Sequence, residues 1–497
     1  MNKVRVAIIG GGLGGLSAAI SLAKHPQFDI TLIEKNSHLG GKLNVLEKEG
    51  FSFDLGPSIF TMPQLFEKLF TMHNRKMKDY FELVPVRPHW RNFFEDGTII
   101  DLTDKIDDMI HQDKITEKDV QELKNFYDYA ERVYEFSNKT YFENQIENQW
   151  QAIKYYPAHK ILKDSDYFKT MHEAITHYIS NPYLIDILDY FIKYVGSSAF
   201  DAPAILNLLP YIQWKFDLWY VKDGMFNLSK GLVKLIHELN IKVMTDTEVI
   251  EIMKRDKDIT TLILKDQRTI DVDLVISNME VIPFYKKITK EDPKKIAPYE
   301  KKYGPACSGF ALHLGVNREY DILRHHNFLF SKDLKLNFDN IFHNHKLSED
   351  PTIYLVAPMK TDPSQGPKGS EIIKILPHIS VVDDDHPFTE SEYAAFREHI
   401  LDKLERLGLT DLRKHIVTEE LWVPETIEEM YYSNHGAIYG VVSDKKLNKG
   451  FKTPKKSKLY NNLYFVGGSV NPGGGMPMVI LSGQQVVEQV LKQKRYQ

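Results

Sequence analysis

The feature that most constrains the fold is a glycine-rich turn close to the amino terminus, GGGLGG at residues 10–15. The apolar run VRVAII precedes it and is typical of a buried parallel strand, and the helical pattern Leu16–Ala23 follows it. A second β-rich run, ITLIE, begins at Ile30 and ends on Glu34. Strand, glycine turn, helix and strand in this order predict a dinucleotide-binding βαβ unit.

The residue types within this unit indicate which nucleotide it binds. Gly10 allows the tight turn, Gly12 lets a pyrophosphate reach the backbone, and Gly15 lets the helix pack closely on the strand. The phosphates would lie at the helix N-terminus, where free N–H groups favour an anion. Glu34 stands where an acid binds the ribose, and its charge disfavours a 2′-phosphate. We therefore expect FAD or NAD before NADP; the alternative is a glycine-rich turn without a ligand.

A second glycine-rich segment, LYFVGGSVNPGGGMPMVILSG, occupies residues 463–483. So many glycines cost backbone entropy unless something must approach the main chain closely. We predict a strand at 463–466, a close-approach turn at Gly467-Gly468 and a loop at 473–475. Pro477 suits the first turn of a helix that continues to about Leu491. A helix-packing turn without a ligand is the alternative interpretation.

The residues that follow Glu34 separate FAD from NAD. Gly40-Gly41-Lys42 and the run DLGPS at 54–58 resemble motifs of the flavoprotein amine oxidase and phytoene desaturase superfamily. In that superfamily the acid is followed by a Gly-Gly-Arg element that contacts FAD, and the carboxyl-terminal segment closes over the flavin. Lys42 replaces the usual arginine, so it offers a point charge instead of a planar fork. From about Val4 to Gln489 the chain is similar to the carotenoid and phytoene desaturase–oxygenase family.

This resemblance implies the fold and the domain organisation. We expect an α/β protein with a Rossmann-type FAD-binding domain, glutathione-reductase-like and of the amine oxidase type, and a discontinuous α+β substrate domain. The FAD-binding domain would comprise residues 1–80, 215–281 and 410–497, and the substrate domain residues 81–214 and 282–409. No cysteine lies near the carboxyl-terminal segment, so we expect non-covalent FAD. The expected cofactor-binding residues are Gly10, Gly12, Leu13, Gly14, Gly15, Glu34, Lys35, Gly40, Gly41, Lys42, Gly56, Pro57, Ser58, Val249, Gly467, Gly468, Gly475 and Met476.

The resemblance also implies a reaction. Long stretches such as YFIKYVGSSAFDAPA at 190–204 and GAIYGVVSDKKLNKGF at 436–451 resemble the oxygenases of the family. These oxidise a terminal methyl group of an apolar thirty-carbon carotenoid to an aldehyde, in carotenoid biosynthesis of the staphyloxanthin type. Carotene desaturation is the alternative, because flavin motifs do not separate the two. An amine oxidase, or a GDP-dissociation inhibitor that escorts prenylated proteins without FAD, is less compatible with the motifs.

Catalytic side chains cannot be assigned from these motifs, since the flavin carries the redox step. Asp201 and His378 are the candidates. The aromatic-rich stretch 190–220 predicts either the wall of a polyene tunnel or plain core, with Phe200, Trp214, Trp219 and Tyr220 as the lining residues. Handover to other enzymes of the carotenoid pathway is implied as well.

Composition excludes several other functions. A net charge of -5 gives no indication of a nucleic-acid partner. The single cysteine, Cys307, excludes an internal disulfide and is predicted to be buried. His343 and His345 stand too close together to predict a metal site.

Lysines gather at 286–302 and 445–458, in solvated loops or against anionic lipid. Met1 is followed almost at once by the first strand, so no signal peptide is expected. No apolar run approaches about 20 residues. We expect a cytoplasmic protein held peripherally on the inner face of the cell membrane.

Three local patterns predict further elements. WRNFFEDGTIIDL at 90–102 predicts a hairpin with Asp96-Gly97 as a type I′ turn. Thr116 is placed to cap a helix, and Thr389 with Glu392 forms a capping box at the start of another.

Overall fold

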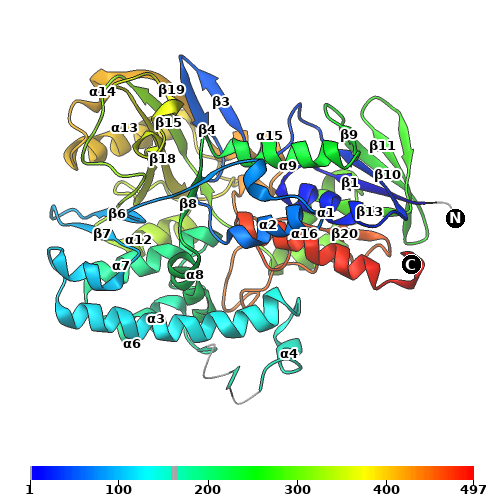
Figure 1. Ribbon diagram of the computed structural model, residues 1–497, viewed down its shortest axis with the longest axis horizontal. Coiled ribbons are helices and arrows are strands. Elements are labelled where there is room, and N and C mark those ends of the chain that lie inside the picture. The colour runs from blue at the N-terminus through cyan, green and yellow to red at the C-terminus, as the bar shows by residue number, and fades with distance from the viewer. Residues whose placement is uncertain (1–2, 158–159, 162–165, 497) are drawn as a thin grey trace.

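Short apolar strands alternate with helices at the start of the chain, and this pattern produces a parallel sheet that is buried on both faces. The computed structural model describes residues 3–157, 160–161 and 166–496. Five strands pair in the order β20-β13-β1-β2-β9, and every neighbouring pair is parallel. Figure 1 shows this sheet near both termini of the chain. The strands are β1 (Val4–Ile9), β2 (Phe28–Ile33), β9 (Lys242–Met244), β13 (Leu274–Ser277) and β20 (Leu463–Phe465).

Alternate residues of the central strand enter two different cores. Val6 and Ile8 pack with α1 (Leu13–Ala23), α9 (Phe226–Glu238) and α16 (Met476–Leu491). Ala7 and Ile9 enter a second core with the antiparallel sheet of β10 (Val249–Arg255), β11 (Asp258–Leu264) and β12 (Thr269–Asp271). The strand is therefore apolar throughout because both of its faces are covered.

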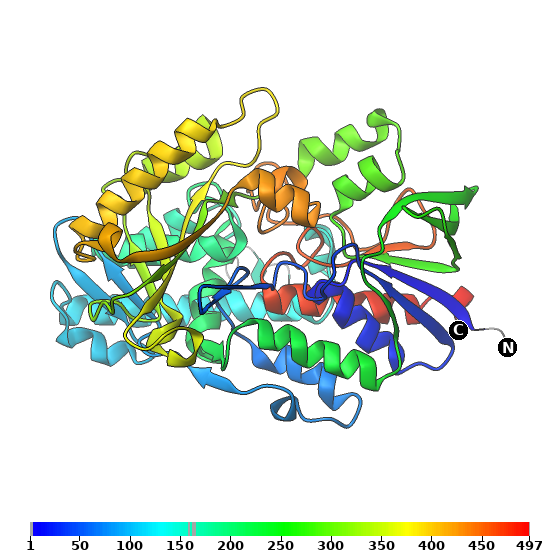
Figure 2. The same ribbon diagram turned by 90° about the horizontal axis from the view of Figure 1, so that it is seen from above.

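Helices α1 and α16 lie against each other although they come from opposite ends of the chain. A Cβ at Gly483 of α16 would lie 2.7 Å from the carbonyl oxygen of Gly14 in α1. The Ser17 hydroxyl donates to the carbonyl of Ile480 at 2.6 Å. Glycine in both helices permits this close approach, and Figure 2 shows α16, in red, beside α1.

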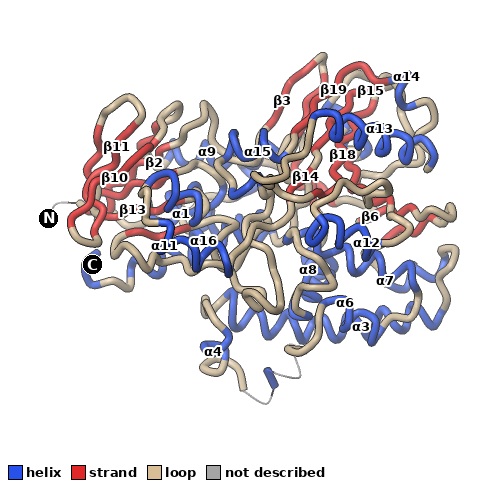
Figure 3. The backbone as a smooth tube through the Cα atoms, turned by 180° about the vertical axis from the view of Figure 1, so that it is seen from behind, coloured by secondary structure: helices blue, strands red, loops and turns tan. Residues whose placement is uncertain are grey.

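A larger mixed sheet forms the other half of the molecule (Figure 3). Helix α13 (Glu390–Arg406) covers one of its faces. The other face packs on aromatic residues of the segment 190–195 and of α12 (Leu334–Asp339). The strand order is β19-β15-β18-β17-β16-β6-β7, with β14 paired to β18. The strands are β6 (Trp90–Phe93), β7 (Ile99–Leu102), β14 (Ser308–Gly309), β15 (Ala311–Val316), β16 (His326–Leu329), β17 (Ile353–Val356), β18 (Glu371–Ile379) and β19 (Ile416–Trp422).

The remaining elements connect and cover the two sheets. Two small hairpin-like pairs are β3 (Val45–Lys48) with β4 (Phe51–Asp54), and β5 (Leu83–Pro85) with β8 (Trp219–Val221). The other helices are α2 (Pro63–Thr71), α3 (Glu117–Ser137), α4 (Gln149–Ala152), α6 (Met171–Tyr178), α7 (Pro182–Asp189), α8 (Leu208–Phe216), α10 (Val281–Pro283), α11 (Pro293–Lys302), α12 (Leu334–Asp339), α13 (Glu390–Arg406), α14 (Leu412–His415) and α15 (Pro424–Tyr431).

The division into domains stays a prediction, and one strand bears on its boundary. Residues of the parallel sheet come from three separated parts of the chain, as a discontinuous FAD-binding domain requires. However, β19 lies inside the range 410–497 and pairs with β15 of the larger sheet.

Both predicted caps are confirmed, whereas the predicted hairpin turn is wrong. Thr116 and Thr389 each accept a hydrogen bond from the backbone three residues on, in reciprocal capping boxes. In the hairpin, the Gly97 N–H donates to the carbonyl of Phe94 at 3.0 Å, and only Gly97 of the Asp96-Gly97 pair has a positive φ. The loop is thus a three-residue type I turn followed by a left-handed glycine. Asp96 avoids the left-handed region and accepts the Thr98 N–H at 2.9 Å.

The contact between α1 and β1 gives a first testable prediction. A Cβ at Gly15 would lie 2.1 Å from the carbonyl oxygen of Gly10. Gly15→Ala is therefore expected to lower the free energy of unfolding by about 1–3 kcal/mol, or to prevent folding, because the helix must shift. Gly304→Ala is the control, since a Cβ there meets no atom within 4 Å. Urea unfolding measures both, and equal midpoints for the two variants would contradict the predicted clash.

Candidate functional site

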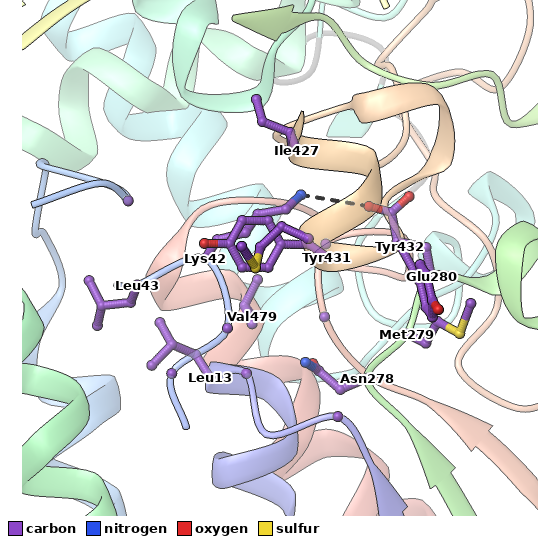
Figure 4. Close-up of a pocket in the computed structure, with 18 of the residues that line it drawn as sticks. Leu13, Lys42, Leu43, Asn278, Met279, Glu280, Ile427, Tyr431, Tyr432 and Val479 are labelled. Atoms are coloured by element: carbon purple, nitrogen blue, oxygen red, sulfur yellow. Dashed lines mark ion pairs between the residues drawn. The ribbon is translucent and has the colours of Figure 1, made fainter. Parts of the chain in front are cut away.

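A cavity opens where the carboxyl ends of the parallel strands meet, at the point between β1 and β13 where the strand order changes direction. Ligands of open α/β sheets bind at such switch points. Figure 4 shows side chains from both ends of the chain converging on this cavity. It is lined by fifteen of the eighteen residues predicted to bind a cofactor: Gly10, Gly12, Leu13, Glu34, Lys35, Gly40, Gly41, Lys42, Gly56, Pro57, Val249, Gly467, Gly468, Gly475 and Met476.

Two glycine segments form the floor of the cavity by direct backbone contact. Gly12 bridges to Gly40, and a Cβ on Gly41 would lie 2.9 Å from the Cα of Gly12. Gly12 is the N-cap of α1 and supplies no side-chain cap, so the first N–H groups of this 11-residue helix are not satisfied by a capping side chain. Free helix N–H groups beside a glycine floor suit a phosphate.

Glu34 follows β2 at the edge of the cavity and is buried. Its Oε2 accepts the Gly11 N–H at 2.7 Å and its Oε1 accepts the Asn36 N–H at 2.9 Å. A carboxylate has about four lone-pair positions, so two remain for hydroxyl donors. The arrangement is compatible with binding a ribose.

Three predicted cofactor residues lie behind the cavity wall. Gly15 packs on Gly10, and a Cβ on Gly14 would lie 2.5 Å from the Asn278 Oδ1. Ser58 is buried, and its hydroxyl accepts a hydrogen bond from the Lys374 Nζ at 3.2 Å. These residues support the wall and do not line it.

Lys42 holds two distant segments together at the cavity. Its Nζ donates to the carbonyls of Ala437 at 2.8 Å and Ile438 at 3.2 Å. It also lies 3.8 Å from the Glu280 Oε1, the ion pair marked in Figure 4. Burial lowers the pKa of Lys42 and raises that of Glu280, and the attraction between the two opposes both shifts. The charge of Lys42 is thus already partly compensated by protein groups.

Lys374 of β18 is a second cation in the cavity wall. Its Nζ donates to the carbonyl of Asp54 at 3.0 Å and also to the carbonyl of Gly56. These bonds fix the DLGPS loop against the larger sheet. Burial lowers the pKa of Lys374 to about 8, although the nearby Asp54 carboxylate opposes the shift.

Four carboxyl-terminal glycines form the remaining wall: Gly467, Gly468, Gly474 and Gly475. Gly467, Gly473 and Gly475 have φ values of 105°, 126° and 90°, which residues with a side chain rarely adopt. Gly475 is the N-cap of α16, which has no capping side chain and no acidic residue in its first turn. The positive end of this helix therefore faces the cavity, and no acidic side chain of its own first turn offsets it.

Asn278, Lys374 and Tyr439 line the cavity and were missed by sequence reasoning. Asn278 directly follows β13, and its buried Oδ1 has no hydrogen-bond partner among the described residues. The rule that ligands bind at the carboxyl ends of parallel strands would have indicated it. Nothing in the local sequence indicates Lys374 or Tyr439, because β18 and residue 439 reach the cavity through tertiary packing.

Comparison with known proteins assigns the family. The model of the flavin-containing amine oxidoreductases matches residues 13–491. The chain belongs to this family.

The 4,4′-diapolycopene oxygenase of a Methylomonas species is 50% identical over 99% of this chain and 98% of its own. The 4,4′-diaponeurosporene oxygenase of Staphylococcus haemolyticus is also 50% identical, over 99% and 97% of the two chains. Putrescine oxidase bound to putrescine shares the fold, with a TM-score of 0.67, 13% identity and 99% coverage of both chains.

As a flavin-containing amine oxidoreductase the protein is a flavin-dependent oxidoreductase, and the cavity is compatible with that cofactor. A side chain at Gly41 would clash with the backbone of Gly12 in the glycine floor, and two uncapped helix N-termini face the cavity. The buried amide oxygen of Asn278 there has no hydrogen-bond partner among the described residues.

The two candidate catalytic residues do not line the cavity. Asp201 is partly exposed, and its Oδ2 lies 2.9 Å from the Nε2 of the exposed His343. His378 lies behind the wall, where its Nε2 is 3.2 Å from the hydroxyl of Tyr439. Burial lowers the pKa of His378 to about 3, so its imidazole is neutral at ordinary pH. Their catalytic roles stay predictions.

The four predicted tunnel residues also lie away from this cavity. Trp214 is 40% exposed and donates its indole N–H to the carbonyl of Asp104 at 3.0 Å. Tyr220 is buried against His325, with ring centroids 4.9 Å apart. Trp219 belongs to the short strand β8, and the rings of Phe200 and His172 contact each other in a tilted arrangement, with centroids 4.4 Å apart. Whether they contact a substrate stays a prediction.

Cys307 is buried, as predicted. Within the described ranges, no group of three or more histidine, cysteine, aspartate or glutamate residues has the arrangement to hold a metal ion.

The buried ammonium of Lys374 gives a prediction about pH. In the folded protein Lys374 loses its proton near pH 8, whereas in the unfolded chain it keeps it to about pH 10.4. Between these values the unfolded state binds more protons, so this lysine makes stability rise with pH, by up to about 3 kcal/mol. We expect Lys374→Met to flatten the rise in unfolding free energy between pH 8 and 10. Lys332→Met, at an exposed position, is the control, and an unchanged slope in Lys374→Met would contradict the prediction.

Proposed function

We propose that this protein is an FAD-dependent carotenoid oxygenase that oxidises a terminal methyl group of 4,4′-diaponeurosporene to the aldehyde 4,4′-diaponeurosporenal. The observation that carries the proposal is the identity of 50% with a named 4,4′-diaponeurosporene oxygenase over nearly the full length of both chains. The equal similarity to a 4,4′-diapolycopene oxygenase makes 4,4′-diapolycopene a second candidate substrate. Both candidates are thirty-carbon polyenes with terminal methyl groups.

The residues of the cavity suit non-covalently bound FAD. The N-terminus of α1 with Gly12 and Gly41 would hold the pyrophosphate, Glu34 the ribose, and the backbone at Val249 the adenine. The N-terminus of α16 with Gly475 and Met476 would lie at the flavin ring. When bound, FAD supplies the hydride acceptor for oxidation of the allylic methyl group.

The chain itself contributes charge and exclusion of water. The uncapped N-terminus of α16 brings positive potential to one wall, and Lys374 brings a second positive charge below about pH 8. Leu376, Ile438 and Val479 supply apolar surface between them. Such surroundings stabilise negative charge that develops on a bound group and keep water from the reacting carbon.

We also infer that the protein takes its apolar substrate from a membrane to which it is bound peripherally, on the inner face of the cell membrane. Among the described residues, no helix combines the length and the apolar character needed to cross a bilayer. The two predicted lysine clusters need revision, however. Lys286, Lys290 and Lys295 pair with Glu300, Glu251 and Glu291. Lys452 and Lys455 are buried and cannot contact lipid.

The mode of flavin binding is directly testable. We expect acid precipitation of the FAD-loaded protein to leave all flavin in the supernatant, because the single cysteine, Cys307, is buried and is not among the residues that line the cavity. Gly12→Val should weaken flavin retention about tenfold or more, since a Cβ there would lie 2.5 Å from the Asn278 Nδ2. Gly304→Val is the control, and absorbance at the flavin band is the readout. Flavin that stays with the precipitate would contradict non-covalent binding.

The substrate is tested with the purified protein, loaded with FAD and given 4,4′-diaponeurosporene in vesicles under air. Mass spectrometry should show a terminal aldehyde, formed through gain of oxygen at a methyl group. 4,4′-Diapolycopene is assayed in parallel, and the ratio of kcat/KM values identifies the preferred polyene. Loss of hydrogen without gain of oxygen would identify a desaturase and overturn the proposal.

A further inference from the structure

One face of the molecule exposes large apolar side chains that a water-soluble surface normally buries. Trp150 is 72% exposed, Phe168 71%, and Ile153 and Leu447 53% each. Tyr155 beside them is 38% exposed. We call these five residues the apolar face. Exposed apolar groups in such density mark interaction sites.

Direct contacts bring the three segments of this face together. The Tyr167 hydroxyl donates to the Gln149 Oε1 at 3.2 Å, which joins residue 168 to α4. The Lys449 Nζ donates to the same Tyr167 hydroxyl at 3.2 Å. Lys445 donates to the carbonyl of Phe168. Figure 1 shows α4 at the lower edge of the molecule, away from the parallel sheet.

Exposed lysines surround the apolar face. Lys154 lies between Ile153 and Tyr155, and Lys446 and Lys449 flank Leu447. In the part of the chain that the structure describes, none of these three forms an ion pair with an acidic side chain. Their charge is thus available to a partner, in contrast to the paired lysines of residues 286–295.

We infer that the apolar face docks on a lipid membrane, with Trp150, Ile153, Phe168 and Leu447 entering the interface and Lys154, Lys446 and Lys449 contacting anionic headgroups. Tryptophan and other aromatic rings favour the headgroup level, and lysines keep their charge at the surface while their stems pass along apolar groups. The side chains project outward from three separate segments. A fluid lipid surface accommodates them without a matching set of pockets.

The chain connects this face to the cofactor cavity. Gly440 lines the cavity, and Leu447 lies seven residues further on, at the surface. Between them the Ser443 N–H donates to the Ser197 hydroxyl at 2.8 Å. A small apolar core lies under the face, formed by Phe136, Ile146, Ala152 and Phe451 with Ile205 packed on it. The interpretation of this connection as a route for an apolar substrate rests on the proposed function. The docking of the apolar face on a membrane does not rest on it.

The test measures sedimentation of the full-length, FAD-loaded protein with phosphatidylcholine vesicles, with and without phosphatidylglycerol. The apolar variant carries Trp150→Gln, Phe168→Gln and Leu447→Gln. We expect it to bind vesicles at least about tenfold more weakly at any salt concentration. The charge variant carries Lys154→Gln, Lys446→Gln and Lys449→Gln, and it should lose roughly tenfold at low salt on anionic vesicles alone.

Two control variants match these changes elsewhere on the surface. Met253→Gln with Val417→Gln replaces apolar side chains that are 54% and 49% exposed, and Lys294→Gln with Lys301→Gln and Lys302→Gln removes three exposed lysines. Both should bind like the unchanged protein. The proposal would be overturned if the apolar variant bound vesicles as tightly as the unchanged protein, or if the control variants lost as much binding as the test variants. Failure of the unchanged protein to bind protein-free vesicles would also overturn it.

A second readout separates docking from the reaction. The apolar variant should keep its activity on carotenoid dissolved in detergent and lose it on carotenoid in vesicles. If the unchanged protein binds vesicles through these residues but oxidises no carotenoid in detergent, the docking face stands and the proposed function fails. If the apolar variant loses activity both in detergent and in vesicles, its substitutions disturb the fold. In that case the milder variants Trp150→Tyr and Phe168→Tyr are tested, and they must bind vesicles for the proposal to hold.

Discussion

The contact between the carbonyl of Gly10 and the Cα of Gly15 is the constraint on which the rest of the structure depends. It holds α1 so close to β1 that the N-terminus of the helix opens directly onto the carboxyl edge of the sheet. Helix α16 is placed in turn by α1, because Gly483 packs on the carbonyl of Gly14. The two uncapped helix N-termini that face the cavity thus have their positions set by the same few glycines. A side chain at Gly15 would push α1 away from β1, and one at Gly483 would push α16 away from α1.

Two lysines connect the walls of the cavity. Lys42 joins the loop after β2 to the carbonyls at 437 and 438, and Lys374 joins β18 to the loop at 54–58. Each ammonium costs free energy to remove from water, and each recovers part of that cost through carbonyl oxygens and a carboxylate. Because every one of these bonds spans more than 300 residues, the lysines hold together segments that the chain itself does not connect. The two lysines therefore hold the cavity walls together and also give these walls positive charge.

Much of the cofactor side could be predicted because its signals are local. The run at 4–9, the glycines at 10–15 and Glu34 follow one another with spacings that a single βαβ unit explains. The first strand has its predicted bounds, whereas the second spans Phe28–Ile33 and ends one residue before Glu34. The carboxyl-terminal segment was recognisable because three glycines there adopt positive φ values. The hairpin turn was predicted wrongly, because an Asp-Gly pair suits both a type I′ turn and a type I turn with a left-handed glycine. The choice between them depends on the register of β6 with β7.

The sequence alone determined the nucleotide-binding unit and the two glycine-rich segments, since each depends on residue types at short spacing, and its single cysteine excluded an internal disulfide. Tertiary structure decided which lysine side chains are exposed to solvent and which are buried. Lys452 and Lys455 stand in a lysine-rich run that a linear view treats as solvated, yet folding buries them, while Lys446 and Lys449 of the same run stay exposed beside Trp150 and Phe168. It also decided that Asn278, Lys374 and Tyr439 share one cavity. Burial and proximity arise from contacts between residues hundreds of positions apart, and no pattern of neighbouring residues carries that information.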